Sequence, residues 1–176
     1  MFVVFSIFGL LIPHKDGRLI DETEPTPARF DDLGLSETSL VVLRKIGFQT
    51  PSPIQASFIP IALSGRDCIG QARTGTGKTA AFVLPILERI DLNNPSTQAL
   101  VLTPTRELSQ QVATEAIRLT LNHAVTTACC VGGRPLKTQM NDLKRGAQIV
   151  IGTPGRVIDL LARGCLDIRE LKIAVL

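Results

Sequence analysis

The sequence predicts an α/β domain built on a doubly wound parallel sheet. Short apolar runs bounded by turn residues alternate with segments whose apolar residues recur at helical spacing. Strands that alternate with helices of this length pair in parallel through right-handed crossovers. The expected strands are residues 67–70, 99–103, 125–131, 148–152 and 172–176, and the expected helices between them are residues 78–90, 106–121, 136–145 and 155–163.

Length and composition restrict the function classes. The chain has 176 residues, enough for one ordinary domain, and 44% of them are hydrophobic and 20% charged, so it can bury a core. The net charge of +3 is compatible with a polyanionic partner. Cys68, Cys129, Cys130 and Cys165 lack the spacing of a zinc site or a disulfide framework, so a reducing, cytoplasmic location is expected.

Residues 1–29 are expected to lie outside the domain, which would then span residues 30–176. Residues 1–12 are apolar apart from Ser6. As a helix they would span only about 18 Å, short of the roughly 30 Å hydrocarbon core, and they lack the basic start of a secretory signal. We expect an irregular extension or a misassigned start codon, with a signal or anchor role as the alternative and no membrane partner. A proline-containing linker follows over residues 13–29.

Two short helices are expected before the first of these strands. Ser36 and Glu37, followed by apolar residues at helical spacing, indicate a capped helix that ends at Gly47. Pro53 then opens a second helix, which extends to about residue 63.

The strongest chemical signal is the sequence A-R-T-G-T-G-K-T at residues 72–79, which joins a predicted strand to a predicted helix. It matches the phosphate-loop pattern except that Ala72 replaces the first glycine. Gly75 and Gly77 allow consecutive backbone N–H groups to turn towards phosphate oxygens. The Lys78 ammonium suits the β and γ phosphates, and the Thr79 hydroxyl can complete the coordination of Mg²⁺. These residues predict a nucleoside triphosphate site, the alternative being a glycine-rich turn whose lysine points to water.

A glutamine at a helix start lies upstream of that loop. Residues 47–55 read G-F-Q-T-P-S-P-I-Q, and the prolines fix the backbone ahead of the helix. The carboxamide of Gln55 has donor and acceptor groups that match the N6 and N7 positions of adenine. Alone this segment is more typical of an ordinary helix start, but together with a phosphate loop it predicts selection of adenine.

Three further loops each follow a predicted strand. Because the carboxyl ends of parallel strands meet at one edge of a sheet, these loops are expected to lie together. Their threonines and arginines suit phosphate groups, and a glycine pair permits close backbone approach. Taken singly, T-P-G-R is more typical of a helix start and the glycine pair of a flexible loop, but a shared edge predicts one groove for a nucleic-acid backbone. The loops contain Pro104, Thr105, Arg106 and Glu107, then Gly132 and Gly133, and then Thr153, Pro154, Gly155 and Arg156.

The order of these motifs resembles that of the DEAD-box ATP-dependent RNA helicases of superfamily two. The resemblance covers residues 30–176. It implies the amino-terminal RecA-like domain of a P-loop NTPase, which binds ATP with Mg²⁺ and holds RNA through sequence-independent contacts of the three loops. It also implies that Phe30 stacks on adenine, that Gln55 reads it, and that Lys78 and Thr79 serve catalysis. The motif that holds the phosphates corresponds to Ala72, Arg73, Thr74, Gly75, Thr76, Gly77, Lys78 and Thr79.

The resemblance also implies parts that the sequence does not contain. The acidic D-E-A-D motif, which holds Mg²⁺, would follow residues 172–176, and the S-A-T motif and the second RecA-like domain are absent as well. We therefore expect a domain that is incomplete at its carboxyl end, with a gap at the sheet centre, poor solubility and no ATP hydrolysis by this polypeptide alone. The expected activity of the whole protein is RNA unwinding by a monomer, and the alternatives are a non-catalytic RNA-binding fragment or another P-loop ATPase.

Overall fold

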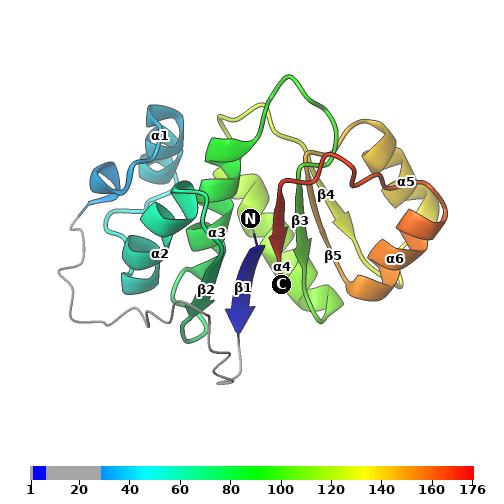
Figure 1. The fold of residues 1–176 in the computed structure, drawn as a ribbon, viewed down its shortest axis with the longest axis horizontal. Helices are drawn as coiled ribbons and strands as arrows, with labels where there is room; N and C mark the ends of the chain where they lie inside the picture. The colour runs from blue at the N-terminus through cyan, green and yellow to red at the C-terminus, as the bar shows by residue number, and fades with distance from the viewer. Residues whose placement is uncertain (1, 7–28) are drawn as a thin grey trace.

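The computed structural model describes residues 2–6 and 29–176. They form a six-stranded sheet in which all neighbouring strands are parallel, in the order β2-β1-β6-β3-β5-β4 (Figure 1). The strands are β1 (Phe2–Ser6), β2 (Cys68–Gln71), β3 (Ala99–Leu102), β4 (Thr127–Cys130), β5 (Ile149–Gly152) and β6 (Ile173–Val175). The helices are η1 (Phe30–Leu33), α1 (Glu37–Lys45), α2 (Pro53–Leu63), α3 (Lys78–Arg89), α4 (Arg106–Leu119), α5 (Leu136–Lys144) and α6 (Pro154–Ala162). Every strand and helix predicted from the sequence is confirmed, with ends that differ by a few residues.

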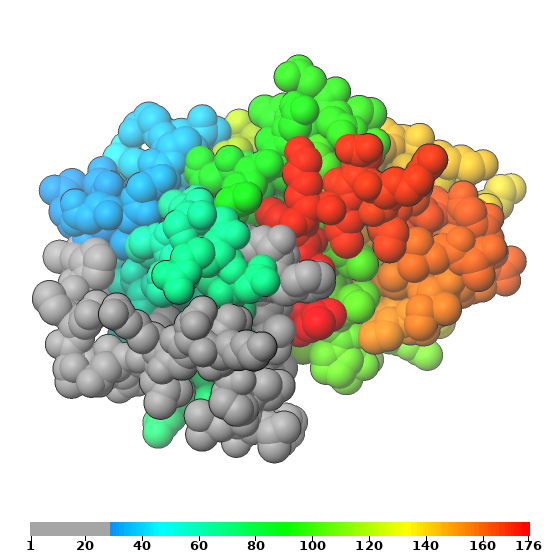
Figure 2. All heavy atoms as spheres, in the orientation of Figure 1, coloured from blue at the N-terminus to red at the C-terminus, as the bar shows by residue number. Residues whose placement is uncertain are grey.

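Helices cover both faces of the sheet, which confirms the doubly wound arrangement. Along β3, Ala99 and Val101 belong to a core cluster with residues of α2, α3 and α4, whereas Leu100 belongs to a second cluster with α5 and α6. Successive residues of a strand face opposite sides of a sheet, so this alternation gives β3 two buried faces. The segment between α6 and β6 returns over the second cluster, where Leu166 packs with Leu160 (Figure 2, red beside orange).

Helix caps explain where the first two α-helices begin. Ser36 precedes α1, and its hydroxyl accepts a hydrogen bond from the Ser39 backbone N–H at 3.4 Å. Ser52 precedes α2 and forms a capping box with Gln55, whose side-chain oxygen accepts from the Ser52 N–H at 2.9 Å. Pro53 opens α2 at a position where its missing N–H costs no hydrogen bond. Both caps stand at helix starts that the sequence predicted.

A partly buried carboxylate ties α1 to the core. Glu88 of α3 accepts hydrogen bonds from the Ser36 N–H at 3.1 Å, the Ser36 hydroxyl at 2.9 Å and the Ser39 hydroxyl at 2.6 Å. The Nε2 atom of His123 lies 3.3 Å from the Ser39 hydroxyl. Burial lowers the pKa of His123, and the nearby Glu88 carboxylate raises it in part. This cluster therefore holds α1 and the turn after α4 against α3.

The centre of the sheet corrects two expectations. We expected an irregular amino terminus and a gap at the sheet centre, but residues 2–6 form β1, which pairs in parallel with β2 and β6. The sequence F-V-V-F is rich in β-branched and aromatic residues and has the length of a strand, a signal that its general apolarity concealed. The rest of the predicted extension and linker, residues 7–28, lies outside the described residues. Among those that are described, no helix is long and apolar enough to cross a bilayer.

Candidate functional site

The loops that the sequence singled out lie at one edge of the sheet. Because the strands are parallel, the segments that follow β2, β3, β4 and β5 emerge at the same edge (Figure 1). The segment after β2 is the phosphate loop, residues 72–79, which ends in the first turn of α3. The segments after β3, β4 and β5 lead into α4, α5 and α6. This edge therefore carries two sites, a loop at the start of α3 and a groove among the other three segments.

The phosphate loop turns at its two glycines. Gly75 has a φ of 80° and Gly77 a φ of 82°, both in the left-handed region that other residues disfavour. Gly77 is also the N-cap of α3, so the helix begins at Lys78 and directs its first N–H groups towards the loop. A β-carbon at Gly77 would in addition collide with the Gln55 carboxamide. The backbone at these two positions therefore needs glycine.

Lys78 folds its side chain over the loop. Its ammonium donates to the carbonyl oxygen of Ala72 and, at 2.8 Å, to that of Arg73. The Thr76 hydroxyl donates to the same Arg73 carbonyl at 2.8 Å, while Thr74 is exposed. Burial lowers the pKa of Lys78 from its ordinary value. These residues fit a triphosphate, because anionic oxygens are stronger acceptors than carbonyls and favour the charged ammonium.

Thr79 is the residue of the phosphate loop whose side chain could contact a metal ion. This residue is partly buried in the first turn of α3. Residues 2–6 and 29–176 contain no group of three or more His, Cys, Asp or Glu side chains that could hold a metal ion. The Thr79 hydroxyl could supply one ligand to Mg²⁺, whose shell in nucleotide sites is completed by phosphate oxygens, water and a carboxylate.

Gln55 and Ser52 hold the phosphate loop from the side. Gln55 Nε2 donates to the Gly77 carbonyl at 3.1 Å, and the Ser52 hydroxyl donates to the Thr76 carbonyl at 2.7 Å. Gln55 is only 2% exposed, and its oxygen already accepts from the Ser52 N–H. The capping box of α2 thus also positions the phosphate loop, a role of Ser52 that the sequence did not reveal. The structure brings Gln55 to the loop as expected, while its recognition of adenine stays a prediction.

Phe30 lies in the hydrophobic core. It is 4% exposed, and its ring meets that of Phe48 edge to face, with 6.0 Å between the centroids and 63° between the planes. Pairs in this geometry stabilise packing beyond the area they bury. Phe30 therefore fixes η1 against the segment that leads to Gln55, and its stacking on adenine stays a prediction.

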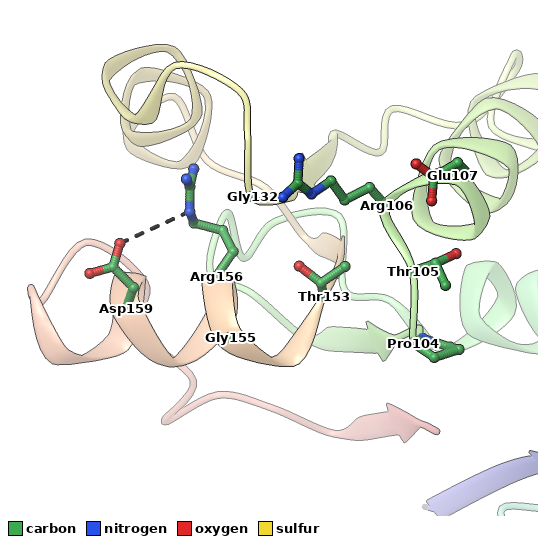
Figure 3. A pocket seen from close by; sticks show the side chains of 9 residues that line it. All are labelled: Pro104, Thr105, Arg106, Glu107, Gly132, Thr153, Gly155, Arg156 and Asp159. Carbon is green, nitrogen blue, oxygen red and sulfur yellow. Dashed lines mark ion pairs between the residues drawn. The ribbon is translucent and has the colours of Figure 1, made fainter.

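The three later loops line one groove of about 600 Å³ (Figure 3). Their positions at the ends of β3, β4 and β5 predicted this meeting. Gly133 and Pro154 belong to the same loops but do not line the groove, and Asp159 lines it although the sequence did not single it out. The lining residues are Pro104, Thr105, Arg106, Glu107, Gly132, Thr153, Gly155, Arg156 and Asp159.

Arg106 lies across the glycine pair. Its side chain extends from the start of α4 towards Gly132 (Figure 3). A β-carbon at Gly132 would lie 3.6 Å from Arg106 Nε, and one at Gly133 would collide with the guanidinium. Gly133 also has a φ of 72°, which favours glycine at this position. Because neither glycine has a side chain, Arg106 can lie against the loop after β4. This contact joins two walls of the groove.

Arg156 and Asp159 form the wall contributed by α6. The Arg156 side chain is 15% exposed, with Nε 4.0 Å from a carboxylate oxygen of Asp159. Arg156 also donates to the Arg134 carbonyl at 3.4 Å, and Asp159 pairs with Arg163 at 2.7 Å. Asp159 thus lies beside Arg156 as a distant ion-pair partner, and their spacing of three residues on one helix is the signal that could have identified it.

Two helix starts add positive potential to the groove. Thr105 is the N-cap of α4 and Thr153 is the N-cap of α6. The Thr105 hydroxyl accepts from the Leu108 N–H at 3.2 Å, whereas the Thr153 hydroxyl makes no such cap bond. Helix starts attract anions, and together with Arg106 and Arg156 they suit a chain of phosphates.

Gln139 is a buried support of the groove that the sequence did not reveal. It is 4% exposed, and its Nε2 donates to the Val131 carbonyl at 3.0 Å. Because Val131 precedes Gly132, this bond fixes the loop after β4. Gln139 lies between Leu136 and Leu143 on the apolar stripe of α5, so a polar residue at a buried helical position was the available signal.

The fold and the phosphate loop define a P-loop nucleotide-binding α/β domain, with a groove lined by Arg106 and Arg156 at the same sheet edge. A family model described as DEAD/DEAH box helicase matches residues 52–176. The chain belongs to the DEAD/DEAH box helicase family, as the resemblance indicated.

Relatives and solved structures agree with this assignment. The chain is 47% identical to the RNA helicase CrhR of Synechocystis over 88% of its own length and 31% of the relative. It is 49% identical to the ATP-dependent RNA helicase DeaD of Haemophilus influenzae, over 84% of its own length and 24% of the relative. The crystal structure of a DEAD box protein from Methanococcus jannaschii matches with a TM-score of 0.77 and 39% identity, over 85% of this chain and 41% of that one. Dbp5 of S. cerevisiae bound to RNA and ADP BeF3 matches with a TM-score of 0.77 and 34% identity, over 85% of this chain and 38% of that one. The predicted fold class is thereby confirmed.

Proposed function

We propose that this chain forms the ATP-binding portion and part of the RNA-binding portion of an ATP-dependent RNA helicase. The single observation that carries the proposal is the groove, which three separate loops build at the same sheet edge as the phosphate loop. The relatives that bear helicase names support it. Because the chain spans 31% and 24% of two of those relatives, the unwinding activity belongs to the proposal for the whole protein.

The phosphate loop would bind ATP through its phosphates. Lys78 and the backbone N–H groups at the start of α3 hold the phosphate oxygens, and Thr79 offers its hydroxyl to Mg²⁺. When bound, Mg²⁺ neutralises phosphate charge. Gln55 holds the Gly77 carbonyl, so contact of adenine with this side chain would also act on the backbone of the phosphate loop.

The groove would bind RNA through its backbone. Arg106 and Arg156 donate to phosphate oxygens from two walls, and the starts of α4 and α6 add N–H groups and positive potential. Such contacts fix the position of the strand and carry no sequence information. The proposed ligand of this groove is therefore RNA of any sequence.

Fluorescence anisotropy with a labelled ten-nucleotide oligouridine, measured with and without the analogue AMP-PNP and Mg²⁺, tests this proposal. We expect RNA binding to weaken as the salt concentration rises. The slope of log K against log salt concentration, which is negative, should become less steep by about 0.7 in Arg106→Gln and in Arg156→Gln. Arg118→Gln is the matched control, because Arg118 stands in the last turn of α4 and is half exposed. Equal effects of all three substitutions, or no binding at all, would refute the groove assignment.

Two other functions give different results in the same assay. A P-loop ATPase without an RNA substrate would bind AMP-PNP but not oligouridine, whereas the groove favours RNA binding. A non-catalytic RNA-binding module would bind oligouridine identically with and without AMP-PNP, and Lys78→Ala would change nothing. The monomeric state and the cytoplasmic location stay predictions, of which size-exclusion chromatography tests the first.

A further inference from the structure

Two buried hydroxyl groups meet at the turn that carries Arg106. Thr103, which follows β3, is 6% exposed, and Ser109 of α4 is completely buried. Their side-chain oxygens are 2.5 Å apart. Both hydroxyls also reach the carbonyl oxygen of Thr105, at 3.2 Å from Thr103 and 3.1 Å from Ser109, and the Ser109 N–H donates to the same oxygen at 3.0 Å. This carbonyl therefore has three donors within reach, and two of them are side chains.

The Thr105 carbonyl belongs to the peptide group that leads into Arg106. A peptide group is planar, so a carbonyl oxygen that is held in place fixes the plane that also contains the N–H and the Cα of Arg106. At a helix start the N–H groups of the first turn have no partner within the helix and point out from its end. The Arg106 side chain leaves from the fixed Cα and extends towards Gly132 (Figure 3). The hydroxyl pair therefore sets the direction of both the N–H and the side chain of Arg106.

Thr103 also connects this turn to the other two walls of the groove. Its N–H donates to the Gly152 carbonyl at 3.0 Å, and Gly152 directly precedes Thr153, the N-cap of α6. The Thr153 N–H in turn donates to the Cys130 carbonyl at 3.1 Å. Backbone hydrogen bonds thus join the ends of β3, β5 and β4, and the Thr103 hydroxyl extends this connection to α4.

We propose that Thr103 and Ser109 are positioning residues, which orient Arg106 towards a phosphate before RNA binds. Neither of the two lines the groove, so they act through Arg106 and not by contact with RNA. A side chain that is already oriented loses less conformational entropy when its ligand binds. This inference rests on the proposed RNA binding by the groove, and the variant Arg106→Gln separates the failure of one from the failure of the other.

The two hydroxyls can replace each other as donors. Each has one hydrogen, so one hydroxyl donates to the other and the second donates to the Thr105 carbonyl, in either order. Removal of one hydroxyl leaves the other within reach of this carbonyl. The geometry therefore predicts a small effect of each single substitution and a larger effect of the two together. Residues that act independently would show additive effects.

Anisotropy with labelled oligouridine and the full chain measures this difference. We expect Thr103→Val and Ser109→Ala each to weaken RNA binding less than about twofold, and the double variant to weaken it at least about fivefold, the equivalent of one ordinary hydrogen bond. Thr103→Ser keeps a hydroxyl and should retain the affinity in the Ser109→Ala background. Thr114→Ala is the matched control, because the exposed Thr114 hydroxyl donates at 2.9 Å to the carbonyl four residues earlier in the same helix, as the Ser109 hydroxyl does.

Combination with Arg106→Gln shows whether the hydroxyl pair acts through Arg106. In this background the double hydroxyl variant should cost no further RNA affinity, because the side chain that it positions has been removed. The affinity for AMP-PNP should be the same in all variants, since a purely structural role would change both affinities.

Several results would overturn the inference. These are additive effects of the single substitutions, equal losses of RNA affinity with and without Arg106, or a parallel loss of AMP-PNP affinity. If Arg106→Gln weakens RNA binding and the double hydroxyl variant does not, the inference fails and the proposed function stands. If Arg106→Gln has no effect, both fail.

Discussion

Gly133 gives a sharp test of how the groove is built, because its substitution acts through Arg106. In Gly133→Ala the residue must keep a φ of 72°, which costs an L-residue about 1–2 kcal/mol. Its β-carbon would also collide with the Arg106 guanidinium, which must move away from the groove wall. The variant should lose the proposed hydrogen bond from Arg106 to an RNA phosphate. Loss of one hydrogen bond to a charged group costs about 1.5–3 kcal/mol, so RNA binding should weaken roughly 10-fold to 150-fold.

Gly164→Ala is the matched control for this substitution. Gly164 has a φ of 63°, and nothing lies within 4 Å of the position that its β-carbon would occupy. Both variants should lose a similar free energy of unfolding in urea titrations, because both carry the same backbone strain. Only Gly133→Ala should lose affinity for oligouridine in anisotropy measurements. Equal affinities of the two variants would refute the conclusion that the glycine pair serves to seat Arg106.

Three further predictions concern single side chains. Lys78→Ala should weaken binding of AMP-PNP at least about tenfold in calorimetric titrations, because a hydrogen bond to the charged phosphates is lost. The affinity for RNA without nucleotide should not change. A decrease in both affinities would place Lys78 in a site that the two ligands share. Gln139→Leu should destabilise the fold by about 1–3 kcal/mol, because the Val131 carbonyl loses its buried hydrogen-bond donor. RNA binding should weaken, whereas AMP-PNP binding should not. Unchanged RNA affinity would contradict the role of Gln139 in supporting the groove. The pKa of His123 is lower in the folded chain than its ordinary value of 6.5, so the unfolded chain binds this proton first as the pH falls. The contribution of neutral His123 to the free energy of unfolding should therefore be fully present above pH 6.5 and decrease below it. Urea titrations of His123→Gln should show a smaller decrease in the free energy of unfolding below this pH. An identical pH profile of the two proteins would contradict this assignment.

The sequence predicted strands β2 to β6 and the site loops because both depend on local patterns. Apolar runs of strand length and amphipathic helices locate the elements, and parallel pairing then brings the loops after β3, β4 and β5 to one edge. The cap at Ser36 and the helix start at Pro53 were likewise visible as local signals. The helix caps are satisfied by neighbours in sequence, whereas the strands are recognised from their local pattern although they pair with distant strands.

The remaining features depend on contacts between distant residues. The second hydrogen bond of Ser52, to the Thr76 carbonyl, and the position of Arg106 over the glycine pair arise only when separate loops meet. β1 was missed for a related reason. Its general apolarity concealed the strand signal, and its partners β2 and β6 lie more than 60 residues away in the sequence.

Hydrogen exchange of the full chain, measured with AMP-PNP and Mg²⁺ and then with oligouridine, tests most directly whether one sheet edge carries two distinct sites. We expect the nucleotide to protect residues 72–79 and the RNA to protect residues 104–107, 131–133 and 153–156, each by at least about tenfold. Protection of the same residues by both ligands, or protection by RNA outside these three loops, would contradict the account.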